Sequence, residues 1–225
     1  GYHTDTTLLK VENFVEQVEA LKTSLGLKEF YLHGHSWGTA LALEYYLKYP
    51  KGIKAIIFNS PYFSTSLWKA DADTLITTLP DSIQLAIKTG EKNHDYGSPA
   101  YKNANEVFYK NFGVRKTKLT SELDTSTAKG NEFIYNYMWG PTEFTAAGTL
   151  INYNRVQSLK TIKVPTLFIT GEFDEARPVT VKYFQSLVPN SKFVMIDGAG
   201  HGTMHDNKGQ NISAVKTFLD SLELK

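Results

Sequence analysis

Four short apolar segments that alternate with helical stretches limit the possible folds of this chain more strongly than any other feature. The segments read KEFYLHG, IKAIIFNSP, VPTLFITG and KFVMIDG, and they begin at residues 28, 53, 164 and 192. Around them, as in residues 9–25 and 211–224, apolar residues recur every three or four positions, which is the spacing of an amphipathic helix. Apolar strands alternating with helices are typical of a parallel sheet covered on both faces. The sequence therefore predicts an α/β fold.

One long region interrupts this alternation. Residues 62–150 contain no comparable apolar strand and are rich in Thr, Lys, Asn and aromatic residues, with helix-like patches such as SIQLAIKTG and NANEVFYKNFG. The pattern predicts a helical insertion between the second and third strands. The chain then divides into residues 1–61, the first part of the sheet domain, residues 62–150, the insertion, and residues 151–225, the second part.

A serine stands between two glycines, in Gly34-His35-Ser36-Trp37-Gly38, directly after the first apolar segment and before a helical stretch. In this context G-x-S-x-G forms a sharp turn that exposes the serine hydroxyl above the sheet edge. The turn is strained, so its neighbours must lack bulk, and the N-terminus of the next helix favours negative charge. The pattern predicts a nucleophilic Ser36 with His35 as a wall of the turn. The alternative is a capping serine in a tight glycine turn.

A nucleophilic serine needs a base and an acid that orients the base, and two later segments supply candidates. Asp174 follows the third apolar segment in ITGEFDEARP, and His201 follows the fourth in IDGAGHGTMHDN. The order Ser36, Asp174, His201 is the order of an α/β-hydrolase triad. We predict that His201 takes the proton from Ser36 and that Asp174 fixes the imidazole tautomer. The alternatives are a turn-forming Asp174 and a merely exposed His201.

The spacing of His201 and His205 would also suit two metal ligands on one face of a helix. Gly200 and Gly202 instead favour a loop, and glycine follows the first histidine where zinc hydrolases of this pattern have a glutamate. We therefore expect neither a metal nor a cofactor.

The composition argues against several other classes of protein. The 225 residues carry 24 Lys and Arg against 23 Asp and Glu, a net charge of +1 without a long charged block, so we expect no binding to nucleic acid or to a membrane. No apolar run approaches the ~18 residues of a membrane span. The start of the chain, GYHTDTT, is not a signal peptide, and cysteine is absent. We expect a soluble protein, with a cytoplasmic, a periplasmic and a secreted location all open.

Four longer blocks of the sequence stand out together: YLHGHSWGTALALEYYLKYP, NYMWGPTEFTAAGTL, VPTLFITGEFDEARP and GAGHGTMHDN. They resemble the proline iminopeptidases, α/β-hydrolases that remove N-terminal residues from peptides, and the resemblance runs over nearly the whole chain. It implies that Ser36, Asp174 and His201 are the triad of a serine aminopeptidase releasing N-terminal proline or another small apolar residue. It also implies that the insertion is a helical cap, and that Glu143 and Glu175 hold the free amino group of a short peptide substrate.

Two carboxylates suit the recognition of a chain end. The N-terminus of a peptide is an ammonium, and carboxylates pair with it; holding it at a set distance leaves only the first peptide bond within reach of the nucleophile. From the residues alone, Glu143 and Glu175 are equally well ordinary solvated or capping residues. Tyr135, Tyr137 and Trp139, just upstream of Glu143, are candidates for the apolar wall around a proline ring, although aromatic residues in a cap are more often core.

Acyl transfer also needs two hydrogen-bond donors for the oxyanion. One is the backbone N–H of Trp37, after the nucleophile. The other comes from a loop after an earlier strand, where the family has an HGGPG-like run that does not occur in this sequence. By resemblance, Gly1 falls just beyond the fourth strand of a complete hydrolase, so we expect the chain to hold the C-terminal half of the sheet. Loss of one donor costs about 10²–10³ in rate, so we expect little activity from this chain alone.

The four strands are expected to lie side by side in chain order, because right-handed crossovers place successive parallel strands together. The strand at residues 29–32 then lies at one edge, where its outer N–H and C=O groups need a cover. We expect a missing N-terminal segment, a second copy of the chain or a rearranged element of the chain to provide it.

Two other functions stay open. One is a capped serine esterase or amidase with the same triad, and the other is an inactive, truncated hydrolase fragment. Glu143 and Glu175 separate the first of these from an aminopeptidase, because an esterase of neutral substrates has no use for a paired anionic pocket.

Overall fold

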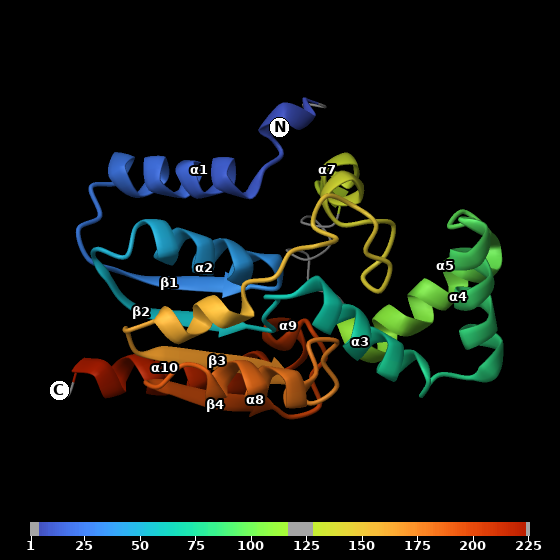
Figure 1. Ribbon diagram of the computed structural model, residues 1–225. Coiled ribbons are helices and arrows are strands. Elements are labelled where there is room, and N and C mark those ends of the chain that lie inside the picture. Colours follow the sequence, from blue (N-terminus) through green and yellow to red (C-terminus); the bar gives the residue numbers. More distant parts are fainter. Residues whose placement is uncertain (1–4, 117–127, 224–225) are drawn as a thin grey trace.

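Four parallel strands form one sheet, in the order in which they follow one another along the chain (Figure 1). The computed structural model describes residues 5–116 and 128–223. Each strand coincides with one of the four apolar segments and pairs in parallel with its neighbour, which confirms the predicted order. The strands are β1 (Phe30–His35), β2 (Ile53–Asn59), β3 (Thr166–Gly171) and β4 (Ser191–Ile196).

Helices cover both faces of the sheet, because successive side chains of a strand point to opposite faces. On β2, Ile56 and Phe58 join the core formed with α1, α2 and α8, whereas Ala55 and Ile57 join the core packed against α10. Burial of such apolar surface contributes about 25 cal/mol per Å² to folding. The helices are α1 (Val11–Ser24), α2 (Trp37–Lys48), α8 (Pro178–Ser186) and α10 (Lys208–Glu223).

The two outer strands are less buried than the sequence indicates. Their apolar runs predict burial, yet Tyr31 on β1 and Met195 on β4 are 42% and 38% exposed. The reason is their position, because each outer strand has a hydrogen-bonded strand on one side only within the described residues. Beyond β1, no strand from residues 5–116 or 128–223 pairs with its outer edge. The cover of this edge stays a prediction.

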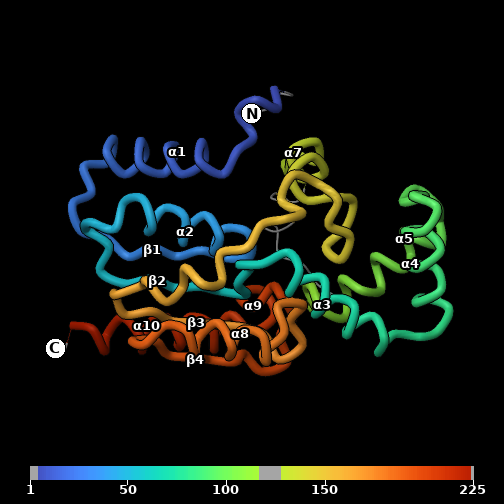
Figure 2. Tube along the Cα trace, in the orientation of Figure 1, coloured from blue at the N-terminus to red at the C-terminus, as the bar shows by residue number. Residues whose placement is uncertain are grey.

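The insertion forms a helical cap beyond the carboxyl ends of the strands, as Figure 2 shows. The described parts of residues 62–150 contain no strand, which confirms the predicted helical insertion. Tyr101, Phe108 and Phe144 pack together in a small core that belongs to the cap. The bounds of the three segments given above stay predictions. The cap helices are α3 (Thr65–Ile76), α4 (Asp81–Asn93), α5 (Pro99–Phe108) and α7 (Glu132–Met138).

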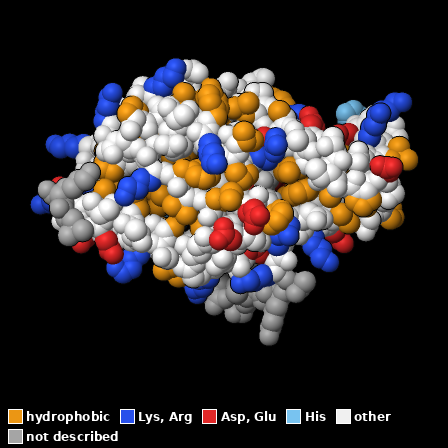
Figure 3. All heavy atoms as spheres, turned by 90° about the horizontal axis from the view of Figure 1, so that it is seen from below, with side chains coloured by type: hydrophobic (Ala, Val, Ile, Leu, Met, Phe, Trp, Pro, Cys, Tyr) orange, Lys and Arg blue, Asp and Glu red, His pale blue; other side chains and the backbone are white. Residues whose placement is uncertain are grey.

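Charged side chains are interspersed on the surface. On the face seen in Figure 3, Lys and Arg side chains lie near Asp and Glu side chains and around hydrophobic groups. This mixture agrees with the net charge of +1. In the part of the chain that the structure describes, no helix combines the length and the apolar character needed to cross a membrane.

Candidate active site

Ser36 stands at a strained turn between β1 and α2. Its backbone has φ 54° and ψ −127°, a positive-φ conformation that residues other than glycine rarely adopt. The Ser36 N–H donates to the main-chain oxygen of Asn59 at the end of β2 (3.0 Å), which fixes the turn against the neighbouring strand. A strained strand-to-helix turn of this kind is typical of a nucleophile elbow.

The two glycines that flank the turn have different roles. A Cβ on Gly34 would lie 2.3 Å from the main-chain oxygen of Gly38, so only glycine fits there. A Cβ on Gly38 would meet no described atom within 4 Å apart from its chain neighbours and the adjacent backbone of α2. The expectation that both neighbours must lack bulk is therefore wrong at Gly38. The reason is that Gly34 lies against the first turn of α2, whereas Gly38 faces open space.

Asp174 and His201 come together at the carboxyl end of the sheet. His201 Nδ1 lies 2.8 Å from Asp174 Oδ1, and both side chains are buried. Because a carboxylate only accepts hydrogen bonds, Nδ1 carries the hydrogen, and Nε2 is free to take a proton. Asp174 also accepts from the N–H groups of Gly171 (3.0 Å) and Ala176 (2.8 Å). Burial acts to raise the pKa of Asp174, but His201 and the hydrogen bonds hold that pKa below its usual value.

The Nε2 atom of His201 is buried and has no hydrogen-bond partner among the described residues. In unliganded sites, catalytic hydrogen bonds are often long and tighten only when substrate binds. Burial acts to lower the pKa of His201, whereas the carboxylates of Asp174 and Glu175 act to raise it, and the net shift is upward. The negative charge around the imidazole therefore makes it a stronger base.

Glu175 is a buried carboxyl group beside the imidazole. It is 1% exposed, and neither of its oxygens has a hydrogen-bond partner within residues 5–116 and 128–223. Its Oε1 lies 3.8 Å from His201 Nδ1. Burial and the nearby Glu143 carboxylate raise the pKa of Glu175 well above its usual range. An unpaired buried charge is costly, so this group is suited to a cation that would pair with it.

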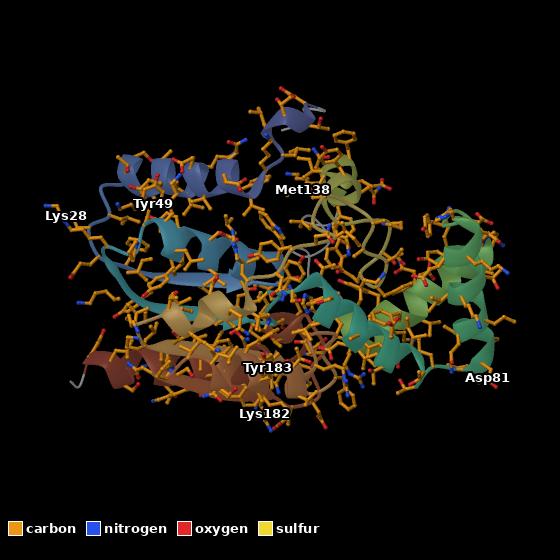
Figure 4. The ribbon with its side chains drawn as sticks, viewed as in Figure 1. Lys28, Tyr49, Asp81, Met138, Lys182 and Tyr183 are labelled. Atoms are coloured by element: carbon orange, nitrogen blue, oxygen red, sulfur yellow. The ribbon has the colours of Figure 1, made fainter. Side chains whose placement is uncertain are left out.

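A cavity of about 790 Å³ opens in front of Ser36. Ser36, Trp37 and Glu143 form part of its wall, whereas Glu175 is not among the lining residues and lies beside His201. The cavity therefore brings the predicted nucleophile and one predicted glutamate to the same space. The rest of the described wall is largely apolar and includes Phe14, Tyr62, Trp68, Ile134, Met138 and Leu150. Figure 4 labels Met138 beside α7.

Two of the three aromatic residues proposed for the pocket line this cavity. Tyr135 and Trp139 belong to its wall, and burial together with the nearby Glu143 carboxylate raises the pKa of Tyr135. Tyr137 is not part of the wall and stacks on Phe133, with ring centroids 6.3 Å apart. Residues four apart share one helix face, and residues two apart do not. The helical geometry of α7 therefore turns Tyr137 away from the residues that line this cavity, and its role in the pocket stays a prediction.

Comparison with known proteins agrees with this geometry. The family model described as the alpha/beta hydrolase fold matches residues 3–208. The chain is 38% identical to a proline iminopeptidase of Heyndrickxia coagulans, over 97% of this chain and 76% of that protein. The chain belongs to the proline iminopeptidase family of α/β hydrolases.

Two solved structures share the fold of this chain over nearly its whole length, and one of them is described as a proline iminopeptidase. The crystal structure of proline iminopeptidase from Mycobacterium smegmatis matches with a TM-score of 0.90 and 26% identity, covering 100% of this chain and 76% of that chain. The crystal structure of VinJ matches with a TM-score of 0.91 and 25% identity, covering 96% of this chain and 74% of that chain. The similarity thus extends over nearly the whole chain and about three quarters of each relative.

In this proline iminopeptidase family member, the cap also holds the loop that carries the base. The His201 N–H donates to the main-chain oxygen of Phe112, which follows α5 (2.8 Å). The Asp206 carboxylate accepts from the N–H groups of Arg115 and Gly200, at 2.9 Å each. These bonds join residues 112–115 of the cap to the loop on both sides of His201. The cap therefore contributes to the position of the imidazole.

Ser60 and Trp68 are among the residues that contact the triad and that were not predicted from the sequence. Ser60 Oγ lies 2.6 Å from Asp174 Oδ2, and the Trp68 ring packs edge-on against the His201 ring with centroids 5.4 Å apart. Ser60 had a usable signal, because it follows β2 at the carboxyl end of a strand, as Asp174 follows β3. Trp68 had none, because it lies inside α3, where an aromatic residue is usually core.

Proposed function

We propose that the protein is a serine aminopeptidase that releases N-terminal proline, or another small apolar residue, from short peptides through an acyl-enzyme. The observation that carries this proposal is Glu175, a buried carboxyl group beside His201 whose oxygens have no partner among the described residues. An esterase of neutral substrates has no use for such a group, whereas an exopeptidase needs an anionic site for the substrate ammonium. The relatives named proline iminopeptidases support the same function.

The proposed reaction begins with attack by Ser36. His201 Nε2 takes the hydroxyl proton as Oγ bonds to the carbonyl carbon of the first peptide bond, and Asp174 stabilises the imidazolium. The Trp37 N–H donates to the oxyanion, because it lies at the start of α2, where helix N–H groups lack an internal acceptor. His201 then protonates the leaving amine, and water hydrolyses the acyl-enzyme by the same route.

The proposed specificity comes from the amino group and the ring of the first residue. Glu143 and Glu175 carry like charges that raise the free energy of the empty site, and a bound ammonium relieves that repulsion. The ammonium then fixes the substrate so that only its first carbonyl reaches Ser36. Tyr135 and Trp139 supply apolar surface for the proline ring.

Acetylation of the substrate amino group is expected to abolish hydrolysis, because it removes the charge that the two glutamates bind. Glu143→Gln and Glu175→Gln are each expected to raise KM for proline amide by about 10–100-fold, since a hydrogen bond to a charged group contributes about 1.5–3 kcal/mol. Steady-state kinetics on proline amide, acetylproline amide and a simple ester measure both effects.

Glu132→Gln is the matched control, because Glu132 is an exposed carboxylate on the wall of the same cavity. It is expected to keep the KM of the unmodified protein. Equal rates on free and acetylated proline amide would contradict the aminopeptidase function and favour a general esterase or amidase.

The acidic limb of the kcat/KM profile is expected to move to lower pH in Glu175→Gln. Activity needs a neutral His201, and the Glu175 carboxylate is one of the groups that raise the pKa of His201. Loss of that charge lowers the pKa, so the base stays neutral at a lower pH. The profile is measured with a simple ester, so that recognition of an amino group does not enter. An unmoved limb would show that Glu175 carries no charge in the free enzyme.

A further inference from the structure

His35 is a half-buried imidazole that the proposed reaction does not use. Its Nε2 lies 2.9 Å from the main-chain oxygen of His201, and the centroids of the two imidazole rings are 4.8 Å apart. A carbonyl oxygen can only accept a hydrogen bond, so Nε2 of His35 carries the hydrogen and donates it. This bond joins the residue before the nucleophile to the main chain of the base.

Other donors near this carbonyl do not replace His35. The Thr203 N–H lies 3.0 Å from it but belongs to the same loop as His201. Ser60 Oγ lies 3.0 Å from the same oxygen and 2.6 Å from Asp174 Oδ2. Its single hydrogen goes to the carboxylate, because that contact is shorter and charge-assisted. Within the described residues, His35 is thus the donor that links β1 to the loop of His201.

His35 is suited to this contact because it stays neutral. Burial and the neighbouring His201 lower the pKa of His35 to about 4. At neutral pH, His35 therefore adds no positive charge beside the imidazolium that forms on His201 during the proposed reaction.

We propose that His35 is a positioning residue that sets the distance between Ser36 and His201, a role that rests on the function proposed above. His35 is the last residue of β1, and the strained Ser36 follows it directly. The hydrogen bond from His35 therefore fixes the His201 backbone relative to the turn that carries the nucleophile. A displacement of about 1 Å at reacting atoms can cost on the order of 10²-fold in rate.

The test compares His35→Met with His35→Gln. Both side chains reach as far from Cα as Nε2 of histidine, but only glutamine keeps an N–H donor. His35→Met is expected to lower kcat on proline amide by about 10–100-fold with little change in KM, and His35→Gln is expected to recover most of that loss. His33→Met, the same substitution on the same strand, is the matched control and is expected to keep the native turnover. Thermal melting checks that each variant folds, and His35→Leu replaces His35→Met if the latter does not.

Covalent labelling of Ser36 by a fluorophosphonate gives a readout that is independent of peptide specificity. The labelling rate is expected to fall in His35→Met and to recover in His35→Gln, in parallel with kcat. If no peptide is cut but labelling follows this order, the aminopeptidase function fails and the positioning role stands. Native labelling in His35→Met, or equal losses in folded His35→Met and His35→Gln, would overturn the positioning role.

Discussion

Replacing Ser36 with alanine in an intact version of the protein is expected to lower kcat by about 10⁶, the scale of loss when a triad serine is removed from a protease. The hydroxyl forms the bond to the substrate carbonyl, and the described residues of the cavity wall include no second serine or threonine. Binding of proline amide is expected to persist, because Glu143 and the aromatic wall are unchanged. The measurements are turnover of proline amide and calorimetric binding of the same compound.

The fold should tolerate this change, because alanine keeps the Cβ of Ser36 and so adds no new strain at φ 54°. Ser213→Ala on α10 is the matched control, because Ser213 is exposed and lies outside the cavity wall. Substantial activity in purified, folded Ser36→Ala would remove Ser36 from the role of nucleophile.

Asp174→Asn is expected to lower kcat by about 10⁴, as the corresponding change does in a serine protease. The carboxylate holds the hydrogen on Nδ1 of His201 at 2.8 Å. An amide group that presents its NH₂ to Nδ1 would favour the wrong imidazole tautomer, with the hydrogen on Nε2. His201 could then no longer take the proton from Ser36. Steady-state kinetics and the rate of fluorophosphonate labelling measure this loss.

The same substitution is also expected to reduce stability. The two oxygens of Asp174 accept separately from the N–H groups of Gly171 and Ala176. An asparagine has only one oxygen, so one buried N–H loses its acceptor at a cost of about 1–3 kcal/mol. Denaturant unfolding measures the change, with exposed Asp197→Asn as the control. Native stability together with native kcat would show that Asp174 does not orient the base.

The sequence by itself determined which elements carry the triad. Apolar segments of strand length, separated by helical periodicity, lead to a parallel sheet whose strands all end at the same edge. Asp174 and His201 each follow such a segment, so the topology brings them to the same edge, where the structure shows them 2.8 Å apart. The need for glycine at position 34 was also predictable from the G-x-S-x-G pattern, and in the structure a Cβ there would collide with the first turn of α2. The roles of Glu143 and Glu175 were not predictable from the residues alone, which fit ordinary solvated or capping residues equally well. The family resemblance was needed to single them out.

Only the tertiary structure decided the environment of the side chains around the triad. Glu175 reads as an ordinary polar residue beside a turn, yet it is 1% exposed. Tyr135 and Tyr137 look equivalent in the sequence, yet only Tyr135 lines the cavity. His35 donates to the carbonyl of a residue 166 positions away. The physical reason is the distance along the chain over which each rule acts. Periodicity and turn rules act over a few residues, whereas burial, pKa and hydrogen-bond partners depend on which distant segments pack together.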